Sequence, residues 1–560
     1  MKRTSQEILE RTVLNTPQRC IFKSMGYTDD ELSKPLIGIA NTWSTICPGS
    51  YNLKELAEFV KKGIYANGGT AVEFGSIGPC DGVVDGDEGG RYTLPSRQIL
   101  CDSIEAMVKA SKLDALVLLS SCDKIVPAQL MAAARLDIPC IFLNGGPMLG
   151  GKEWNGKKSD QTTHDEMIGA LTAGKGVSEE DIFAMEDVSM PTVGSCSFLG
   201  TANTMCCIGE ALGMSLPGSA LIPAVYAARL RMGYESGRAI CDLTRAGITA
   251  RQIITADSLR NAVRVTSAIC GSTNAPIHLA AIAKEAGIEI DIMHEFADAY
   301  QKVPQIAMVN PAAKWDMEEF YKAGGIPKVM SHLGDLLHTG VMTVTGQTLG
   351  ENLKKQQYPY EDVHHIIRTR ADAYEPTGAL QVLTGNLAPA GSITKPGAFD
   401  RSLYQFTGKA RVYDGEETAN AAILRGDIED GDVIVIRYEG PKGGPGMREM
   451  YRSMKYLYGQ GKGTTTALIT DGRFSGTNNG CFVGHISPEA AEGGPIALIE
   501  DGDEIRIDVG NGTLELMVPD EILAERRSRW TPPRIHIPEG YLRLYARLAA
   551  SPSDGAGILL

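Results

Sequence analysis

The sequence predicts an α/β fold, with an N-terminal parallel-sheet α/β domain (residues 1–370) and a smaller β-rich, barrel-like C-terminal domain (residues 371–560). Three observations predict this class. The 560 residues exceed the roughly 100 to 200 residues of a typical single domain. Helical and strand patterns alternate through the first part, as they do around parallel sheets. The second part is Gly-rich, β-branched and short in period, which favours β structure.

Apolar periodicity predicts the elements of the first domain. In chain order they are a helix over 53–63, a strand over 71–74, a helix over 104–110, a buried strand over 115–119, a helix over 127–134 and a strand over 138–143. Ligands of open α/β sheets bind beyond the carboxyl ends of the strands. The loop that follows residues 115–119 is therefore a candidate binding site.

The second domain begins between two breaks in the helical pattern, at 358–360 and 375–378. Farther on, apolar residues alternate over 505–509 and over 514–518, on either side of Asn511-Gly512. This pattern predicts a β-hairpin with a primed turn.

Charge and composition narrow the classes of partner. The chain has 54 Lys and Arg against 68 Asp and Glu, a formal net charge of -14, which disfavours binding to nucleic acid or to anionic membranes. We expect a small-molecule substrate. No apolar signal segment follows Met1, and no apolar run reaches the roughly 18 residues of a spanning helix. We therefore expect a cytoplasmic protein.

Twelve cysteines in a chain of this kind are read as thiols, buried small hydrophobes or metal ligands rather than as disulfides. Free cysteines are among the most buried residues. We expect seven of them to be simply packed: Cys20, Cys101, Cys140, Cys206, Cys207, Cys241 and Cys481.

Three short segments combine chemistry-bearing side chains. Cys122-Asp123-Lys124 follows the buried strand, and its soft thiolate beside a hard carboxylate suggests two different metals. Cys196 stands in a Gly- and Ser-flanked turn before an apolar helix, where free N–H groups would lower a thiol pKa. Cys80-Asp81 repeats the thiol–carboxylate pair in a turn. Each segment alone is more often structural.

The C-terminal domain adds a glycine-dense loop, residues 438–450, and a strand end, residues 468–476, that exposes Ser475. Glycines let the backbone approach a ligand closely. A hydrolase elbow is disfavoured because Gly-x-Ser-x-Gly is absent. The sequence also lacks His-Glu-x-x-His, Walker and dinucleotide-binding motifs.

Together these motifs resemble the family of dihydroxy-acid and sugar-acid dehydratases over nearly the whole chain. The matching phrases, in family order, are 37–43, 122–124, 194–205, 271–275, 385–389, 438–441, 472–475 and 485–489.

The resemblance implies a hydro-lyase, homodimeric or homotetrameric, that removes water from a 2,3-dihydroxy acid to give a 2-oxo acid. It implies an iron–sulfur cluster that accepts the C3 hydroxyl and a Mg²⁺ ion that binds the carboxylate and the C2 oxygen. The implied cluster ligands are Cys122 and Cys196, the Mg²⁺ ligands are Asp81, Asp123, Glu449 and a carbamylated Lys124, and the base is Ser475.

One departure from the family concerns the cluster. Relatives with a 2Fe-2S cluster carry a third cysteine where this chain has Gly49, and Pro48-Gly49 resembles the relatives with a 4Fe-4S cluster, which we favour. Cys80 and Cys47 are both candidates for the third ligand. An ordinary buried thiol is the alternative for each.

A second departure concerns the substrate. Gly200 stands where branched-chain enzymes usually have an aromatic residue, which favours a sugar-acid (aldonate) dehydratase that yields a 2-keto-3-deoxy acid. Segments 80–83, 91–97 and 472–489 instead resemble the dehydratases of branched-chain amino-acid biosynthesis. We favour the latter, with 2,3-dihydroxyisovalerate and 2,3-dihydroxy-3-methylvalerate as substrates. An inactive cluster-bearing sensor and a cluster-free magnesium hydrolase remain as alternatives.

Overall fold

The N-terminal half of the fold is built on a four-stranded parallel sheet. The computed structural model describes residues 3–534 and 537–558. The sheet has the order β2-β1-β3-β4, with β1 (Leu36–Asn41), β2 (Thr70–Gly75), β3 (Ala115–Ser120) and β4 (Cys140–Asn144). All three pairings are parallel. The predicted parallel sheet is therefore confirmed, although β1 was not among the strands predicted from periodicity.

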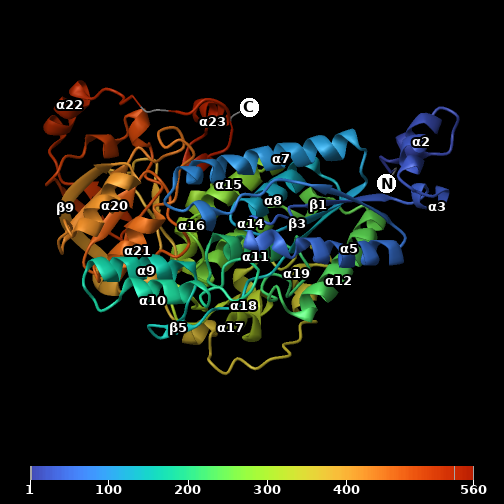
Figure 1. Ribbon diagram of the computed structural model, residues 1–560, viewed down its shortest axis with the longest axis horizontal. Coiled ribbons are helices and arrows are strands. Elements are labelled where there is room, and N and C mark those ends of the chain that lie inside the picture. The colour runs from blue at the N-terminus through green and yellow to red at the C-terminus, as the bar shows by residue number, and fades with distance from the viewer. Residues whose placement is uncertain (1–2, 535–536, 559–560) are drawn as a thin grey trace.

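Helices cover both faces of this sheet. Figure 1 shows α5 (Leu53–Ala66) and α12 (Ala227–Ala246) on one side, and α7 (Thr93–Ala110) and α8 (Ile125–Leu136) on the other. Every residue of β1 and β3 is buried, as expected for a strand covered on both faces. The strands therefore expose only their ends, where loops can reach a ligand.

Further helices and a short hairpin complete the N-terminal part. They are α1 (Gln6–Leu9), α2 (Thr16–Ser24), α3 (Asp29–Leu32), α4 (Pro48–Tyr51), α6 (Asp81–Val84), η1 (Glu88–Tyr92), β5 (Glu153–Trp154), β6 (Lys157–Lys158), α9 (Gln161–Thr172), α10 (Glu179–Glu186), α11 (Thr201–Ala211), α13 (Ala250–Ile253), α14 (Ala256–Ala268), α15 (Ala275–Ala286), α16 (Ile292–Lys302), α17 (Met317–Lys322), α18 (Gly325–Leu333), η2 (Gly334–Leu336), α19 (Leu349–Leu353) and η3 (Arg370–Asp372). Within the described residues, no helix is both long enough and apolar enough to cross a bilayer.

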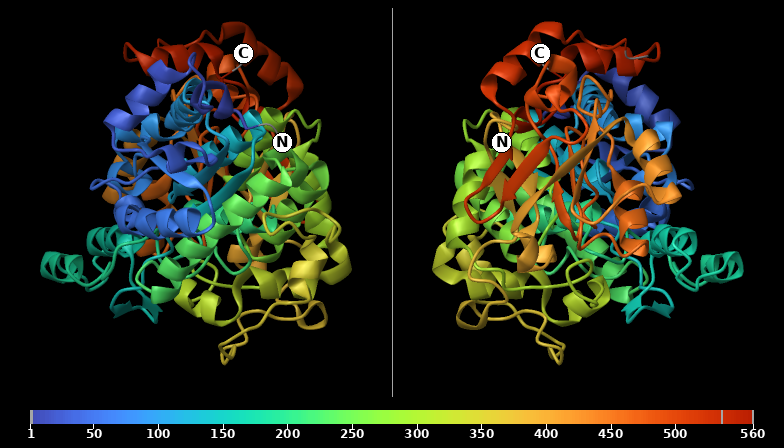
Figure 2. Two further views of the ribbon diagram at one scale, coloured as in Figure 1. Left: turned by 90° about the vertical axis from the view of Figure 1, so that its right-hand side faces the viewer. Right: turned by 90° about the vertical axis from the view of Figure 1, so that its left-hand side faces the viewer.

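The C-terminal part contains a curled, six-stranded half-barrel, which Figure 2 shows in orange and red. Its order is β12 (Cys481–Val483), β11 (Ala467–Thr470), β10 (Asp432–Arg437), β9 (Gln405–Asp414), β13 (Glu504–Asp508) and β14 (Thr513–Leu516). The first four strands are mutually parallel, and the last two pair antiparallel. The predicted β-rich, barrel-like character is confirmed.

Shorter elements surround the half-barrel. They are β7 (Gln381–Leu383), β8 (Ser392–Thr394), η4 (Pro396–Ala398), η5 (Arg401–Leu403), α20 (Glu416–Arg425), α21 (Tyr451–Gly459), η6 (Ala490–Glu492), η7 (Pro495–Leu498), α22 (Asp520–Arg529), α23 (Tyr541–Leu548) and η8 (Pro552–Asp554).

The predicted hairpin exists, but its turn differs from the prediction. Asp508 pairs with Thr513, so four residues, 509–512, connect the strands instead of the two of a primed turn. The Asp508 carboxylate accepts hydrogen bonds from the backbone N–H and the side-chain amide of Asn511, at 3.0 and 2.9 Å. These side-chain bonds stabilise the longer loop.

The two sheets are joined by a close helix crossing between α9 and α21 (Figure 1). A Cβ placed on Gly169 would lie 2.4 Å from the carbonyl oxygen of Tyr456, and one on Gly459 would lie 2.0 Å from that of Glu166. Only glycine permits such an approach. This crossing brings the C-terminal segments that follow β10 and β11 against the carboxyl ends of the N-terminal strands.

Candidate functional site

The site lies beyond the carboxyl ends of β1, β2 and β3, where open α/β sheets bind ligands. The cavity there is lined by residues of both parts of the chain. Its lining includes Cys80, Asp81, Asp85, Cys122, Asp123, Gln161, Cys196, Phe198, Gly200, Thr201, Glu449 and Ser475. The structure thus brings residues together that are almost 400 positions apart in the sequence.

Three thiols form a compact group at this cavity. The Sγ atoms of Cys47, Cys80 and Cys122 all lie within 4.8 Å of one another, a spacing that could hold a metal. Cys122 has a φ of 81°, a left-handed conformation that costs energy in a non-glycine residue and is often found at functional sites. Cys196 is outside this group but lines the same cavity as Cys80 and Cys122.

Gly49 occupies the space between two of the cysteine loops. A Cβ at this position would lie 3.3 Å from Cβ of Ser121 and 3.5 Å from Cα of Ser195, the residues that precede Cys122 and Cys196. A thiol at position 49 would point between these loops. In this chain, position 49 contributes only backbone to the space between these loops. The nearby thiols are those of Cys47 and Cys80, the two candidates for the third cluster ligand.

The other cysteines are mostly buried away from the cavity. Of the seven that we expected to be packed, Cys101, Cys140, Cys206, Cys207, Cys241 and Cys481 are buried. The expectation was wrong for Cys20 of α2, which is exposed.

Three carboxylates form a second group beside the thiols. Single oxygens of Asp81, Asp123 and Glu449 lie within 4.8 Å of one another. The Lys124 ammonium donates hydrogen bonds to Asp81 and, at 2.8 Å, to Oε1 of Glu449. Its Nζ lies 3.8 Å from Asp123 Oδ2. The structure therefore brings all four predicted magnesium ligands together around one point.

Burial and neighbouring charges together set the protonation of this group. Desolvation raises the pKa of Asp123 to about 8. Burial and the Arg473 charge act to lower the pKa of Lys124, but the surrounding carboxylates outweigh both and raise it. Burial acts to raise the pKa of Glu449, yet the neighbouring cations Lys124 and Arg473 hold it below its ordinary value. Glu449 is therefore the carboxylate most firmly ionised.

Arg473 and Asn274 orient Glu449. Arg473 Nη1 and Asn274 Nδ2 donate to Oε1 of Glu449 at 2.8 and 2.9 Å. Asn274 Nδ2 also donates to the carbonyl oxygen of Phe474 at 3.0 Å, next to Ser475. Sequence reasoning did not assign roles to these two residues, although both lie inside phrases that carried the family resemblance.

The turn that carries Ser475 is held by buried lysines. Lys395 Nζ donates to the carbonyl oxygen of Gly476 at 2.8 Å, and Lys455 Nζ donates to that of Thr477 at 3.2 Å. Both lysines are fully buried. Burial lowers the pKa of each. Nothing in their local sequence identified them, because their partners lie 81 and 22 positions away.

One expectation about the site, a lowered thiol pKa at Cys196, was wrong. Burial, reinforced by Asp123, raises the pKa of the Cys196 thiol, because desolvation of a thiolate outweighs the N-terminal dipole of α11. The glycine-dense loop 438–450 reaches the cavity through Glu449. Glu489 holds the middle of this loop by accepting hydrogen bonds from the N–H groups of Lys442 and Gly443.

Two polar residues of the cavity were missed. Asp85 and Gln161 line it, and Asp85 lies one helical turn beyond Asp81, a spacing that could have been noticed. Burial, together with Glu449 and Asp81, raises the pKa of Asp85 well above its ordinary value.

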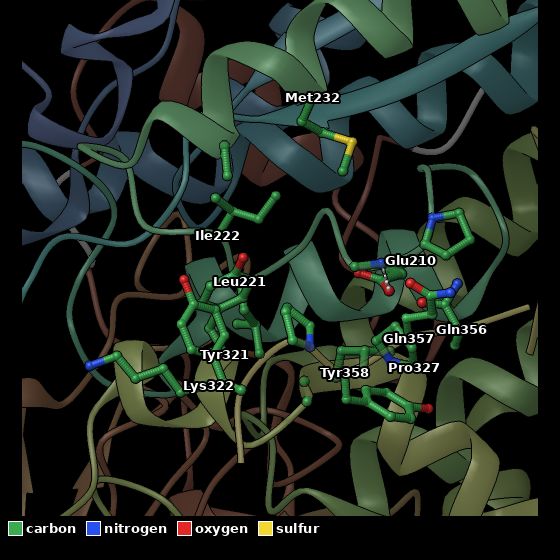
Figure 3. A pocket seen from close by; sticks show the side chains of 18 of the residues that line it. Glu210, Leu221, Ile222, Met232, Tyr321, Lys322, Pro327, Gln356, Gln357 and Tyr358 are labelled. Carbon is green, nitrogen blue, oxygen red and sulfur yellow. Dashed lines mark hydrogen bonds between the residues drawn. The ribbon is translucent and has the colours of Figure 1, made fainter. Parts of the chain in front are cut away.

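A second cavity lies between α11, α12, α17, α18 and residues 356–360, as Figure 3 shows. Its buried acid, Glu210, accepts backbone hydrogen bonds from Gly218 at 2.6 Å and Ala220 at 2.8 Å. Both oxygens are therefore engaged in holding a loop. Among the described residues that line this cavity there is no thiol and none of the sequence-predicted site residues.

Comparison with known proteins agrees with this arrangement. Residues 34–352 match the model of the dihydroxy-acid/6-phosphogluconate dehydratase N-terminal domain, and residues 365–556 match that of the C-terminal domain.

Full-length relatives carry the same name. The chain is 46% identical over 552 residues to a dihydroxy-acid dehydratase of Caldanaerobacter subterraneus, covering 98% of each chain. It is 46% identical over 552 residues to that of Pyrococcus abyssi, covering 98% of this chain and 99% of the relative. It is 47% identical over 544 residues to that of Caldicellulosiruptor bescii, covering 96% and 97%. With the thiol and carboxylate groups at one cavity, these matches establish that the chain belongs to the dihydroxy-acid/6-phosphogluconate dehydratase family.

Proposed function

We propose that this chain is a dihydroxy-acid dehydratase, a hydro-lyase of branched-chain amino-acid biosynthesis. It converts 2,3-dihydroxyisovalerate and 2,3-dihydroxy-3-methylvalerate to the corresponding 2-oxo acids. The observation that carries the proposal is the junction at Cys122-Asp123, where the thiol group and the carboxylate group meet at a cavity that Ser475 also lines. The near-complete match to relatives of that name supports the same substrates.

The thiols are suited to an iron–sulfur cluster, since soft thiolates at short mutual spacing are its usual ligands. Cys80, Cys122 and Cys196 face the cavity together, which favours Cys80 over Cys47 as the third ligand. Position 49, where relatives with a 2Fe-2S cluster carry their third cysteine, is a glycine in this chain, so we favour a 4Fe-4S cluster over 2Fe-2S.

The carboxylates are suited to Mg²⁺, a hard cation that binds oxygen ligands. Asp81, Asp123 and Glu449 would hold it, with Lys124 as a carbamate. Carbamylation joins the amine to CO2 and converts a cation into an oxygen ligand, which explains why a lysine lies among three carboxylates. The cluster and Mg²⁺, when bound, would supply the Lewis acidity that loss of a C3 hydroxyl requires.

Residues of the chain would then remove the proton from C2 of the substrate. The Ser475 alkoxide takes the proton from C2, the C2–H electron pair forms the C2–C3 double bond, and the C3–O bond breaks. The departing hydroxide takes up a proton and leaves as water, and loss of a proton from the Ser475 hydroxyl restores the alkoxide. The resulting enol tautomerises to the 2-oxo acid. A serine hydroxyl is a weak base at its free pKa, so positive charge nearby must favour the alkoxide. The ammonium groups of Lys395 and Lys455, bound to the adjacent carbonyls, contribute to that charge.

The test is an assay of protein purified anaerobically with Mg²⁺. 2-Oxo acid formation is compared between 2,3-dihydroxyisovalerate and a panel of aldonates, with iron and labile sulfide measured on the same sample. Turnover of dihydroxyisovalerate that decays in air supports the proposal. Turnover of aldonates alone contradicts the substrate, and an intact cluster without turnover of either contradicts the enzyme.

We also propose a domain boundary near residue 370 and assembly into a homodimer or homotetramer. Apolar side chains flank the cysteine loops with large exposed fractions, including 70% for Ile46 and 60% for Val83. Exposed apolar patches of this kind favour burial against another subunit. Light scattering measures the assembly, and a monomeric mass at micromolar concentration contradicts it.

A further inference from the structure

The cavity has one aromatic wall, and it is made by an unusual pair of residues. A Cβ placed on Gly200 would lie 2.6 Å from Cε2 and 3.1 Å from Cδ2 of Phe198. The ring of Phe198 therefore lies directly against the Cα of Gly200, in space that any side chain at position 200 would claim. Both residues line the cavity, and Phe198 is 3% exposed.

The same glycine contacts the turn of the proposed base. A Cβ on Gly476 would lie 2.7 Å from Cα of Gly200, so the backbones of the two glycines touch. Gly476 follows Ser475. Gly200 therefore contacts both the Phe198 ring and the turn that carries Ser475, and the ring and Ser475 line the same cavity.

The Phe198 ring is apolar, whereas most of the other residues that line the cavity are polar or acidic. Asp81, Asp85, Asp123, Glu449 and Gln161 give the cavity a polar, acidic lining. Among the described residues that line it, Phe198 alone has a large apolar side chain. A substrate with one carboxylate, two hydroxyls and an alkyl end has only this place at which the alkyl end avoids contact with charged groups.

We propose that Phe198, seated over Gly200, is a specificity-determining residue that receives the C3 alkyl groups of the substrate. This inference rests on the proposed function and names the subsite that selects its substrate. An alkyl group packs against the ring, whereas the hydroxyls of an aldonate tail would lose water there without gaining a hydrogen-bond partner.

The pair also accounts for the departure noted at position 200. Gly200 lacks the aromatic side chain usual in branched-chain enzymes, yet an aromatic ring fills the adjoining space from position 198. Gly200 on its own therefore does not indicate a polyhydroxylated substrate, because the glycine is what allows the Phe198 ring to lie there.

The test compares kcat/KM for 2,3-dihydroxyisovalerate and D-gluconate in wild type, Phe198→Ala and Phe198→Leu. We expect Phe198→Ala to lower kcat/KM for dihydroxyisovalerate by about tenfold to 200-fold, the range for lost apolar contacts in a binding site, mainly through KM. The ratio of gluconate to dihydroxyisovalerate turnover should rise. Phe198→Leu should retain most of the selectivity. Phe296→Leu, at a fully buried phenylalanine of α16, is the matched control and should leave the ratio unchanged.

A binding measurement separates recognition from turnover. Calorimetry with 2-hydroxyisovalerate, which lacks the C3 hydroxyl and cannot be dehydrated, should show weaker binding to Phe198→Ala than to wild type. Iron and Mg²⁺ content should be equal in both. An unchanged substrate ratio and unchanged affinity in a cluster-loaded Phe198→Ala variant overturn the inference. Absence of dihydroxyisovalerate turnover in loaded wild type would instead overturn the proposed function.

Discussion

Lys124 and Glu449 meet across the two parts of the fold, with Nζ of the lysine 2.8 Å from Oε1 of the glutamate and both side chains buried. They are 325 positions apart in the sequence. One residue follows β3 of the N-terminal sheet and the other precedes α21. The carboxylate group therefore contains residues from both parts of the chain. Its geometry depends on how the N-terminal and C-terminal parts pack against each other.

The first prediction concerns carbamylation of Lys124. The carboxylates keep this lysine protonated, and only a neutral amine adds CO2, so Mg²⁺ must first offset their charge. We expect native mass spectrometry to show the added mass of one CO2 only when Mg²⁺ and bicarbonate are supplied together. Lys124→Arg keeps the cation but cannot be carbamylated, and it should show neither the added mass nor activity. Full activity of Lys124→Arg would refute the carbamate.

The second prediction concerns the base. Ser475→Ala removes the hydroxyl that lines the cavity, and kcat should fall by about 10² to 10⁴, the usual contribution of a general base. Iron, sulfide and Mg²⁺ content should not change. Ser453→Ala is the matched control, since this buried serine of α21 bonds Asn420 at 2.6 Å and does not line the cavity. Comparable losses in both variants would count against a catalytic role for Ser475.

The third prediction concerns Lys395 as a positioning residue. Lys395→Met removes the donor to Gly476 and leaves a buried carbonyl without its partner, a loss of about 1 to 3 kcal/mol of stability. It also removes positive charge that favours the Ser475 alkoxide, so the rising limb of the kcat–pH profile should move to higher pH. A profile that keeps its position while kcat falls would indicate a purely structural role. Lys395→Arg should restore part of the wild-type profile.

The fourth prediction concerns the third cluster ligand. Cys80→Ser should lower iron and labile sulfide as strongly as Cys122→Ser and Cys196→Ser, because these three thiols face the cavity. Cys47→Ser should retain a cluster with the optical and spin-resonance spectra of wild type. Cys481→Ser, at a buried thiol of β12, serves as the control. Cluster loss in Cys47→Ser with retention in Cys80→Ser would reverse the assignment.

The fifth prediction concerns acid stability. Burial, with Arg473 nearby, lowers the pKa of His485 to about 3, so this histidine is neutral in the fold and takes up a proton on unfolding below its ordinary pKa of about 6.5. Its contribution to stability is complete above pH ~6.5 and falls by about 1.4 kcal/mol per pH unit down to pH ~3.

Thermal unfolding as a function of pH measures this effect. His485→Gln should reduce the dependence of Tm on pH between about 6 and 4, whereas His294→Gln, at an exposed histidine, should leave it as in wild type. Equal slopes in wild type and His485→Gln would show that other groups control the acid limb.

The local apolar pattern was enough to predict three of the four strands of the N-terminal sheet, β2, β3 and β4. The strand predicted over 115–119 is β3, Ala115–Ser120, because a short apolar run covered on both faces has few other conformations. β1 escaped prediction because Gly38 interrupts its pattern. The glycine is required there, since a Cβ at this position would lie 2.7 Å from Leu113 Cδ1. Leu113 is distant from Gly38 in the sequence, so this crowding cannot be recognised from the apolar periodicity around Gly38.

The order of the short motifs was sufficient to predict the family, the α/β class and the residue types around two groups of ligands, because strand ends and tight turns place neighbouring side chains in ways that local backbone geometry dictates. Packing alone decided that Cys47 and Cys80 both lie beside Cys122, how Asn274 and Lys395 support Glu449 and the Ser475 turn, and that the Phe198 ring lies against Gly200. Those contacts join loops separated by tens to hundreds of residues. The distances between these loops depend on the crossing of α9 with α21 and on the docking of the half-barrel against the parallel sheet. Neither arrangement can be predicted from a local sequence pattern.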